Sequence, residues 1–165
     1  MHLRVTLFKS DMARANLLLL TKSPSSIKSI AIFVIAIGAF IYWSRSPETP
    51  IDWLVLGVSA VIGGLLSFVV SCSISLVWIL SNSTEKAGVI GEHYFEITEQ
   101  GFREKTNQND SVQGWSGMLK PMRSKQLTLV RINAYLFHVL PRRAFADDHE
   151  YDAWWNELSR RCGAV

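Results

Sequence analysis

The chain has 165 residues, of which 48% are apolar and only 19% charged, and it carries a formal net charge of +3. This length fits one small domain with an appendage. The apolar content excludes a disordered protein and is unusual for a soluble domain. Most of the apolar residues fall between positions 27 and 80. Composition therefore predicts a membrane protein.

Two apolar segments form a transmembrane hairpin in this prediction. The first, residues 27–43, has one lysine near its start and ends on Tyr42 and Trp43, which suit a membrane interface. The second, residues 53–80, carries no charge. Because a second span follows so soon and no small-residue cleavage site precedes a mature domain, a retained hairpin is favoured over a signal peptide.

Charge counts on the flanks predict the orientation of this hairpin. Residues 1–28 contain five Lys or Arg side chains and one acidic side chain, whereas residues 44–52 contain one Arg and two acidic side chains. Flanks rich in Lys and Arg stay in the cytoplasm. We therefore expect the linker outside the cell and both termini in the cytoplasm.

Small residues recur at four-residue spacing in the second span and offer a face for close helix packing. They are Ser59, Ala60, Gly63 and Gly64. Two interpretations stay open, namely packing within the hairpin and self-association with a second copy. The deep parts of both spans lack acidic residues, Arg and His, which disfavours a pump or transporter.

Residues 1–26 are predicted to form an N-terminal cytoplasmic strand and short helix. Apolar and polar residues alternate over positions 2–7, the pattern of a strand. Ser10 or Asp11 is expected to cap a helix over residues 12–20. Because an isolated strand is unstable, we expect this strand to pair with the C-terminal sheet.

Residues 81–165 are predicted to form a small antiparallel sheet. Strands are expected over residues 92–98, 102–106, 126–132 and 135–140, with a strand or short turn at 112–115 and a polar turn at 107–110. We expect Gly101 to adopt a left-handed conformation in the first hairpin.

The last helix of the chain closes this sheet. Asp147 and Asp148 suit its start, and Gly163 suits its end. Its apolar stripe, expected in the core, comprises Tyr151, Trp154, Trp155 and Leu158. The predicted fold class is therefore membrane α + β, a two-helix transmembrane hairpin with a small cytoplasmic antiparallel sheet closed by a C-terminal helix.

A family resemblance follows from two N-terminal spans and the stretch GWSGMLKPMRSKQLTLVRINAYLFHVLPRRAF. This combination resembles the YcxB-like family of bacterial membrane proteins. The matching positions are Trp115, Ser116, Pro141, Arg142, Arg143, Ala144 and Phe145. The resemblance implies an inner-membrane location, a YcxB-like domain over residues 81–165, and no established catalytic activity. The same domain also resembles small pleckstrin-homology-like sheets with one closing helix.

Structural roles suit three of these positions. Pro141 can end a strand because proline removes a backbone donor. Phe145 is expected to set the angle of the last helix, and Trp115 is expected in the core.

Two basic clusters are candidate interaction sites. One is Arg142 with Arg143, and the other is Lys120 with Arg123 and Lys125. Each is either a solvated basic corner or a contact for lipid phosphates at an anionic leaflet.

The motifs of catalysis and of metal binding are not complete in this sequence. Residues 114–117 resemble part of a nucleophile elbow, but Met118 stands where the last glycine belongs. The histidines lack a metal-binding spacing, and neither Cys72 nor Cys162 has a His or Cys beside it. We therefore expect no enzyme, no cofactor, no metal site and no nucleic-acid partner.

Three functions remain open. The chain is expected to hold a small cytoplasmic domain at the membrane, where the domain binds a protein partner or lipid headgroups. Alternatively, it is an immunity protein that neutralises a toxin acting at or beneath the membrane. The third possibility is an oligomeric channel or pore regulator. The first function is favoured because it requires the fewest special properties of the residues.

Overall fold

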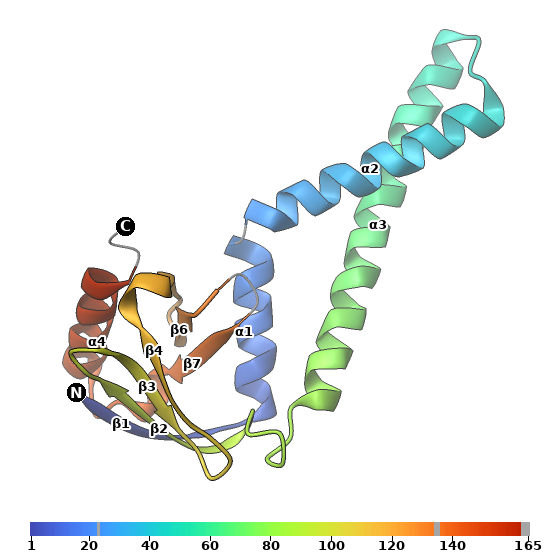
Figure 1. Ribbon diagram of the computed structural model, residues 1–165. Coiled ribbons are helices and arrows are strands. Elements are labelled where there is room, and N and C mark those ends of the chain that lie inside the picture. The colour runs from blue at the N-terminus through green and yellow to red at the C-terminus, as the bar shows by residue number, and fades with distance from the viewer. Residues whose placement is uncertain (23, 134–135, 163–165) are drawn as a thin grey trace. The chain divides into compact units, whose positions relative to one another are not determined.

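The computed structural model describes residues 1–22, 24–133 and 136–162 and divides the chain into two compact units (Figure 1). The β unit contains residues 1–16 together with the chain from residue 79 onward. The helical unit contains residues 17–78. The N-terminal segment and the C-terminal part, which the sequence analysis treats as separate regions, thus belong to one unit.

Three helices occupy the first half of the chain. They are α1 (Lys9–Lys22), α2 (Pro24–Arg45) and α3 (Pro50–Asn82). Helices α2 and α3 are long and apolar enough to cross a membrane, and the chain itself buries almost none of their residues. With about 1.5 Å per residue, α2 is about 33 Å long and α3 about 50 Å, compared with about 30 Å for a bilayer core.

The connection between α2 and α3 is fixed by local hydrogen bonds. Ser46 follows α2 with a positive φ of 43°. Thr49 and Asp52 then bond reciprocally, because the Thr49 backbone N–H donates to Asp52 Oδ2 at 2.9 Å and the Asp52 N–H donates to Thr49 Oγ1 at 3.2 Å. This capping arrangement sets the start of α3 at Pro50, a residue that suits the first helical position.

The small residues of α3 contact α2 within the hairpin. Ala60 and Gly64 are buried, and a Cβ on Gly64 would lie 2.9 Å from the backbone nitrogen of Val34. A Cβ on Gly63 would lie 3.1 Å from Ile37 Cδ1. Ser59, the fourth predicted packing residue, is exposed. The close face therefore serves packing of α3 against α2.

Replacing Gly64 with alanine should weaken this packing by about 1 to 2 kcal/mol, because the new methyl group meets backbone atoms of Val34 that cannot rotate away. The matched control is Gly57→Ala in the same helix, where nothing lies within 4 Å and alanine should be neutral or stabilising. Thermal loss of helical circular dichroism in detergent measures both. Equal responses would contradict the packing described here.

The β unit contains two antiparallel sheets. The first has the order β1 (His2–Leu7), β2 (Gly91–Ile97), β3 (Gly101–Lys105) and β4 (Asp110–Gly114). The second has the order β5 (Leu119–Arg123), β6 (Leu127–Arg131) and β7 (Phe137–Pro141). Short 3-10 helices follow β4 and β7, at Trp115–Gly117 and Arg142–Ala144, and the last helix is α4 (Asp148–Arg161).

Strand β1 pairs with β2, although the whole helical unit separates the two strands in sequence (Figure 1). Leu3 lies opposite Phe95, and Val5 lies opposite His93. The inward side chains of β1 are buried, as their alternation in the sequence predicts. The expected pairing of the N-terminal strand with the C-terminal sheet is confirmed.

The sequence predicts one antiparallel sheet, whereas the structure has two, and two details within them also differ from the prediction. Gly101 does not adopt a left-handed conformation, since it begins β3 without a positive φ. Glycine is needed there because a Cβ would lie 2.7 Å from the carbonyl carbon of Gln113 on β4. Strand β5 was not predicted, because Pro121 and a register shift between Leu119 and Met122 break the alternation.

Helix α4 packs on the second sheet and begins where the sequence predicts. The Asp147 side chain accepts a hydrogen bond from the Glu150 N–H at 2.7 Å, and the Glu150 side chain accepts one from Ala146 at 2.8 Å. Cys162 is the residue that caps its end, and the predicted end residue Gly163 lies outside the described residues. The helix buries Tyr151, Trp154 and Leu158, whereas Trp155 of the predicted stripe is half-buried.

The core of the β unit lies between the sheets and α4. Its largest fully buried apolar side chains are Trp154, Phe95, Phe102, Leu127, Leu129, Leu140, Leu158, Val130 and Val139. Pro141 and Phe145 of the family-like motif are also buried, with the Phe145 ring 5.0 Å from that of Tyr151. Trp115 was expected in the core but is half-buried, and its indole N–H donates to the Thr98 carbonyl at 3.2 Å.

Candidate functional site

The five basic residues singled out in the sequence lie in three different places. Lys120 is an exposed residue of β5. Arg123, on the same strand, lies against α4. Lys125, Arg142 and Arg143 line one pocket. The pair Arg142 and Arg143 therefore stays together, whereas the cluster of Lys120, Arg123 and Lys125 is divided.

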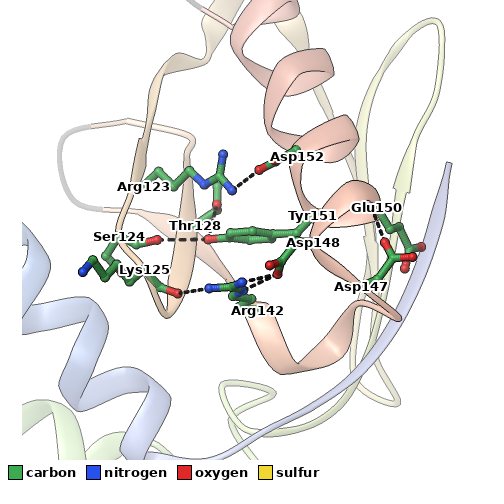
Figure 2. Close-up of polar contacts among 10 residues, drawn as sticks. All are labelled: Arg123, Ser124, Lys125, Thr128, Arg142, Asp147, Asp148, Glu150, Tyr151 and Asp152. Carbon is green, nitrogen blue, oxygen red and sulfur yellow. Dashed lines mark hydrogen bonds and ion pairs between the residues drawn. The ribbon is translucent and has the colours of Figure 1, made fainter.

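Arg123 joins β5 to helix α4. It forms an ion pair with Asp152, and its guanidinium carbon lies 4.2 Å from the centre of the Tyr151 ring (Figure 2). The same carbon lies 5.6 Å from the centre of the Trp155 ring. Burial lowers the pKa of Arg123, but hydrogen bonds to Asp152 and Tyr151 outweigh this and raise it. Because Asp152 and two rings already engage this cation, its geometry is that of a packing contact.

Arg142 ties the start of α4 to the turn between β5 and β6. Its guanidinium forms an ion pair with Asp148, with the Nε–H donating at 2.7 Å. Its Nη1 also donates to the Lys125 carbonyl at 3.4 Å (Figure 2). The Arg142 backbone N–H donates to the Gln126 carbonyl at 2.8 Å. Both charged side chains of the ion pair remain accessible to solvent.

Arg143 fastens the N-terminal segment to the rest of the β unit. Its guanidinium donates to Asp11 Oδ1 at 2.6 Å and Oδ2 at 2.7 Å, and to the Thr6 carbonyl at 2.9 Å. The Asp11 side chain is only 1% exposed and also accepts the Phe8 N–H at 2.9 Å. Helix α1 begins at Lys9, so Asp11 acts from the first turn rather than from the cap position expected in the sequence analysis.

One pocket beside the start of α4 is lined by several charged side chains. It has a volume of about 430 Å³ and is lined by Arg14, Lys125, Gln126, Arg142, Arg143, Phe145, Ala146, Asp147 and Asp148. Four basic and two acidic side chains line it, which leaves a formal excess of two positive charges. The sequence does not group Arg14 with this pocket, because Arg14 lies on α1, far along the chain from Lys125, Arg142 and Arg143. Such a pocket is suited to an anion.

A second polar cluster is buried between the two sheets. Glu104 Oε1 lies 2.9 Å from His93 Nδ1 on β2 and 3.1 Å from His138 Nδ1 on β7. The His93 side chain is only 3% exposed, and its Nε2 is buried without a hydrogen-bond partner. Sequence reasoning did not single out Glu104, although His93 alternates with the apolar Phe95 on the inner face of β2. Among the described residues, no group of three metal-binding side chains is placed to hold an ion.

The Glu104 carboxylate should make stability fall in acid. Burial raises its pKa, but hydrogen bonds from His138 and His93 outweigh this and lower the pKa from 4.5 to about 2. A carboxylate whose pKa is lower in the folded than in the unfolded chain stabilises the fold at pH values above its unfolded pKa. For Glu104 this stabilisation is lost as the pH falls from about 4.5 to about 2.

Glu104→Gln should therefore flatten the fall in unfolding free energy between pH 4.5 and 2 by an amount on the order of 2 kcal/mol. The control is Glu99→Gln at an exposed turn residue, which should keep the wild-type slope. Denaturant titrations at several pH values measure both slopes. An unchanged slope in Glu104→Gln would refute this role for the carboxylate.

Comparisons of the chain with protein-family models, curated proteins and solved structures found no match. The chemistry of the described residues thus carries the functional argument.

Proposed function

We propose that this chain is a non-enzymatic membrane protein whose helical hairpin holds a small β domain at the cytoplasmic face. The observation that carries this is the apolar surface of α2 and α3. Both helices are long enough to cross a bilayer, and almost none of their residues are buried by the chain. Surface of this kind and extent is stable in hydrocarbon rather than in water.

The orientation in this proposal places both termini in the cytoplasm of a bacterial cell, with the protein in the inner membrane. It is supported by five basic residues against one acidic residue in positions 1–28, and by one basic residue against two acidic residues in positions 44–52. The β unit, which contains residues 1–16 and the chain from residue 79 onward, then lies in the cytoplasm.

A YcxB-like domain of the pleckstrin-homology-like kind belongs to the same proposal. Its support is the motif ending in Pro141 and Phe145, together with antiparallel sheets of four and three strands and a C-terminal helix. In this arrangement the hairpin is an insertion between the first and second strands of the domain.

The domain is proposed to bind a protein partner or lipid headgroups. The pocket lined by Arg14, Lys125, Arg142 and Arg143 supports a binding role. Its lining residues carry charges that can attract a ligand, and they include no nucleophile paired with a general base. The experiment is purification of the full chain in mild detergent, with mass spectrometry of everything that co-purifies and of the intact particle.

A stoichiometric protein partner or a retained lipid supports the binding role, and a toxin as the partner would identify an immunity protein. A homo-oligomer without lipid or partner would contradict the binding role and favour a channel. A bare monomer would also contradict it.

A further inference from the structure

We propose that the pocket between α1, the β5–β6 turn and the start of α4 binds the phosphate of an anionic lipid headgroup, with Arg14 and Lys125 as its main ligands. This inference rests on the proposed membrane location.

Arg14 and Lys125 are the two basic side chains of the pocket that are not held in an ion pair within the described part of the chain. No ion pair joins either side chain to a described acidic residue, whereas Arg142 and Arg143 are held by Asp148 and Asp11. A phosphate entering the pocket therefore meets two free cations beside two that are already positioned.

The backbone sets the positions from which both free cations project. Arg14 is an exposed residue of α1 next to the fully buried Ala15, so the helix sets its direction. Lys125 lies at the tip of the β5–β6 turn, where the Ser124 hydroxyl accepts the N–H groups of Gln126 and Leu127 at 3.2 Å each. The Lys125 side chain projects away from α4, as Figure 2 shows.

Arg142 is placed to join them. Its partner Asp148 is 69% exposed, so this ion pair is well solvated and weak, and one guanidinium edge can turn to a phosphate. Arg143 differs, because its partner Asp11 is buried and holds it in a fixed position. Arg143 is thus a positioning residue of the pocket wall rather than a ligand.

The sequence position of Arg14 favours a lipid as the source of the phosphate. Arg14 lies on α1, and the next helix, α2, starts at Pro24 with an apolar stretch long enough to cross a membrane. Basic side chains close to the cytoplasmic entry of a span are attracted to anionic headgroups. Free inorganic phosphate offers the same chemistry, and the experiment must separate these two sources.

The test uses the full chain in a nonionic detergent, titrated with phosphatidylglycerol or with phosphatidylcholine, while native mass spectrometry counts retained lipids. The test variant is Arg14→Gln with Lys125→Gln. The matched control is Lys9→Gln with Lys105→Gln, which removes the same charge from two exposed residues outside the pocket. A third arm measures the thermal midpoint with inorganic phosphate alone.

The wild-type chain and the control pair should retain phosphatidylglycerol in preference to phosphatidylcholine, and the test pair should bind it about 10- to 30-fold more weakly. Equal weakening in both pairs would overturn the proposal, as would an unchanged affinity in the test pair. Stabilisation by inorganic phosphate without a preference for the anionic lipid would overturn the lipid source.

Failure of the membrane location is distinguishable from failure of the pocket. A chain that leaves the membrane fraction in an alkaline wash contradicts the proposed function itself. A chain that stays in the membrane but shows no preference for phosphatidylglycerol contradicts only the headgroup site.

Discussion

Replacing Arg143 with methionine is expected to lower the free energy of unfolding by about 3 kcal/mol. The substitution leaves the Asp11 carboxylate, which is 1% exposed, without its only ion-pair partner among the described residues. Removing one member of a buried pair is costly because the remaining charge stays desolvated. The expected value is at the lower end for such pairs, since Arg143 itself is 41% exposed. Denaturant unfolding of the full chain in detergent, followed by tryptophan fluorescence, measures the loss.

The neighbouring residue provides the control for this prediction. Arg142 pairs with the exposed Asp148, so Arg142→Met should cost no more than about 1 kcal/mol. A double variant, Asp11→Asn with Arg143→Met, should recover part of the stability because no buried charge is left unpaired. Similar losses in Arg142→Met and Arg143→Met would show that the Asp11 contact does not hold the N-terminal segment.

Gly101→Ala is expected to destabilise the β unit by about 3 kcal/mol. The added methyl carbon would clash with the backbone carbonyl of Gln113. Because the clash is with backbone atoms, no side-chain rotation can relieve it. Strands β3 and β4, which pair from Gly101 to Lys105, would have to separate at this end.

Gly114→Ala tests this reasoning on the partner strand. Gly114 lies opposite Gly101, but its nearest atom to a new Cβ is the Gln100 carbonyl oxygen at 4.0 Å, so alanine should change stability by less than about 0.5 kcal/mol. Thermal unfolding of both variants gives the comparison. A neutral Gly101→Ala would contradict the close approach of β3 and β4.

Local patterns explain which parts of the fold the sequence predicts. The alternation of Leu3 and Val5 predicts β1, and the charged start of α4 at Asp147 predicts that helix, because both signals lie in adjacent residues. Strand β5 lacks such a signal, since Pro121 and the irregular pairing hide its alternation. The prediction of a left-handed Gly101 is wrong for a related reason. The need for glycine there comes from the close approach of Gln113, which the local sequence does not show.

The candidate site is harder to predict, because long-range contacts build it. Arg142 and Arg143 are adjacent in sequence, yet one pairs with Asp148 nearby and the other with Asp11 at the far end of the chain. The sequence offers no periodicity that brings Arg14 beside Lys125. Such contacts follow only from the pairing of β1 with β2, which brings the start of the chain into the C-terminal unit.

The central claim is that α2 and α3 span a membrane with the β unit in the cytoplasm. Single cysteines at Glu48, in the linker, and at Glu99, in a turn of the β unit, test it in a chain with Cys72→Ser and Cys162→Ala. A membrane-impermeant maleimide applied to spheroplasts should label Glu48→Cys at once and Glu99→Cys only after lysis. Labelling of Glu99→Cys in intact spheroplasts, or protection of Glu48→Cys, would contradict the account.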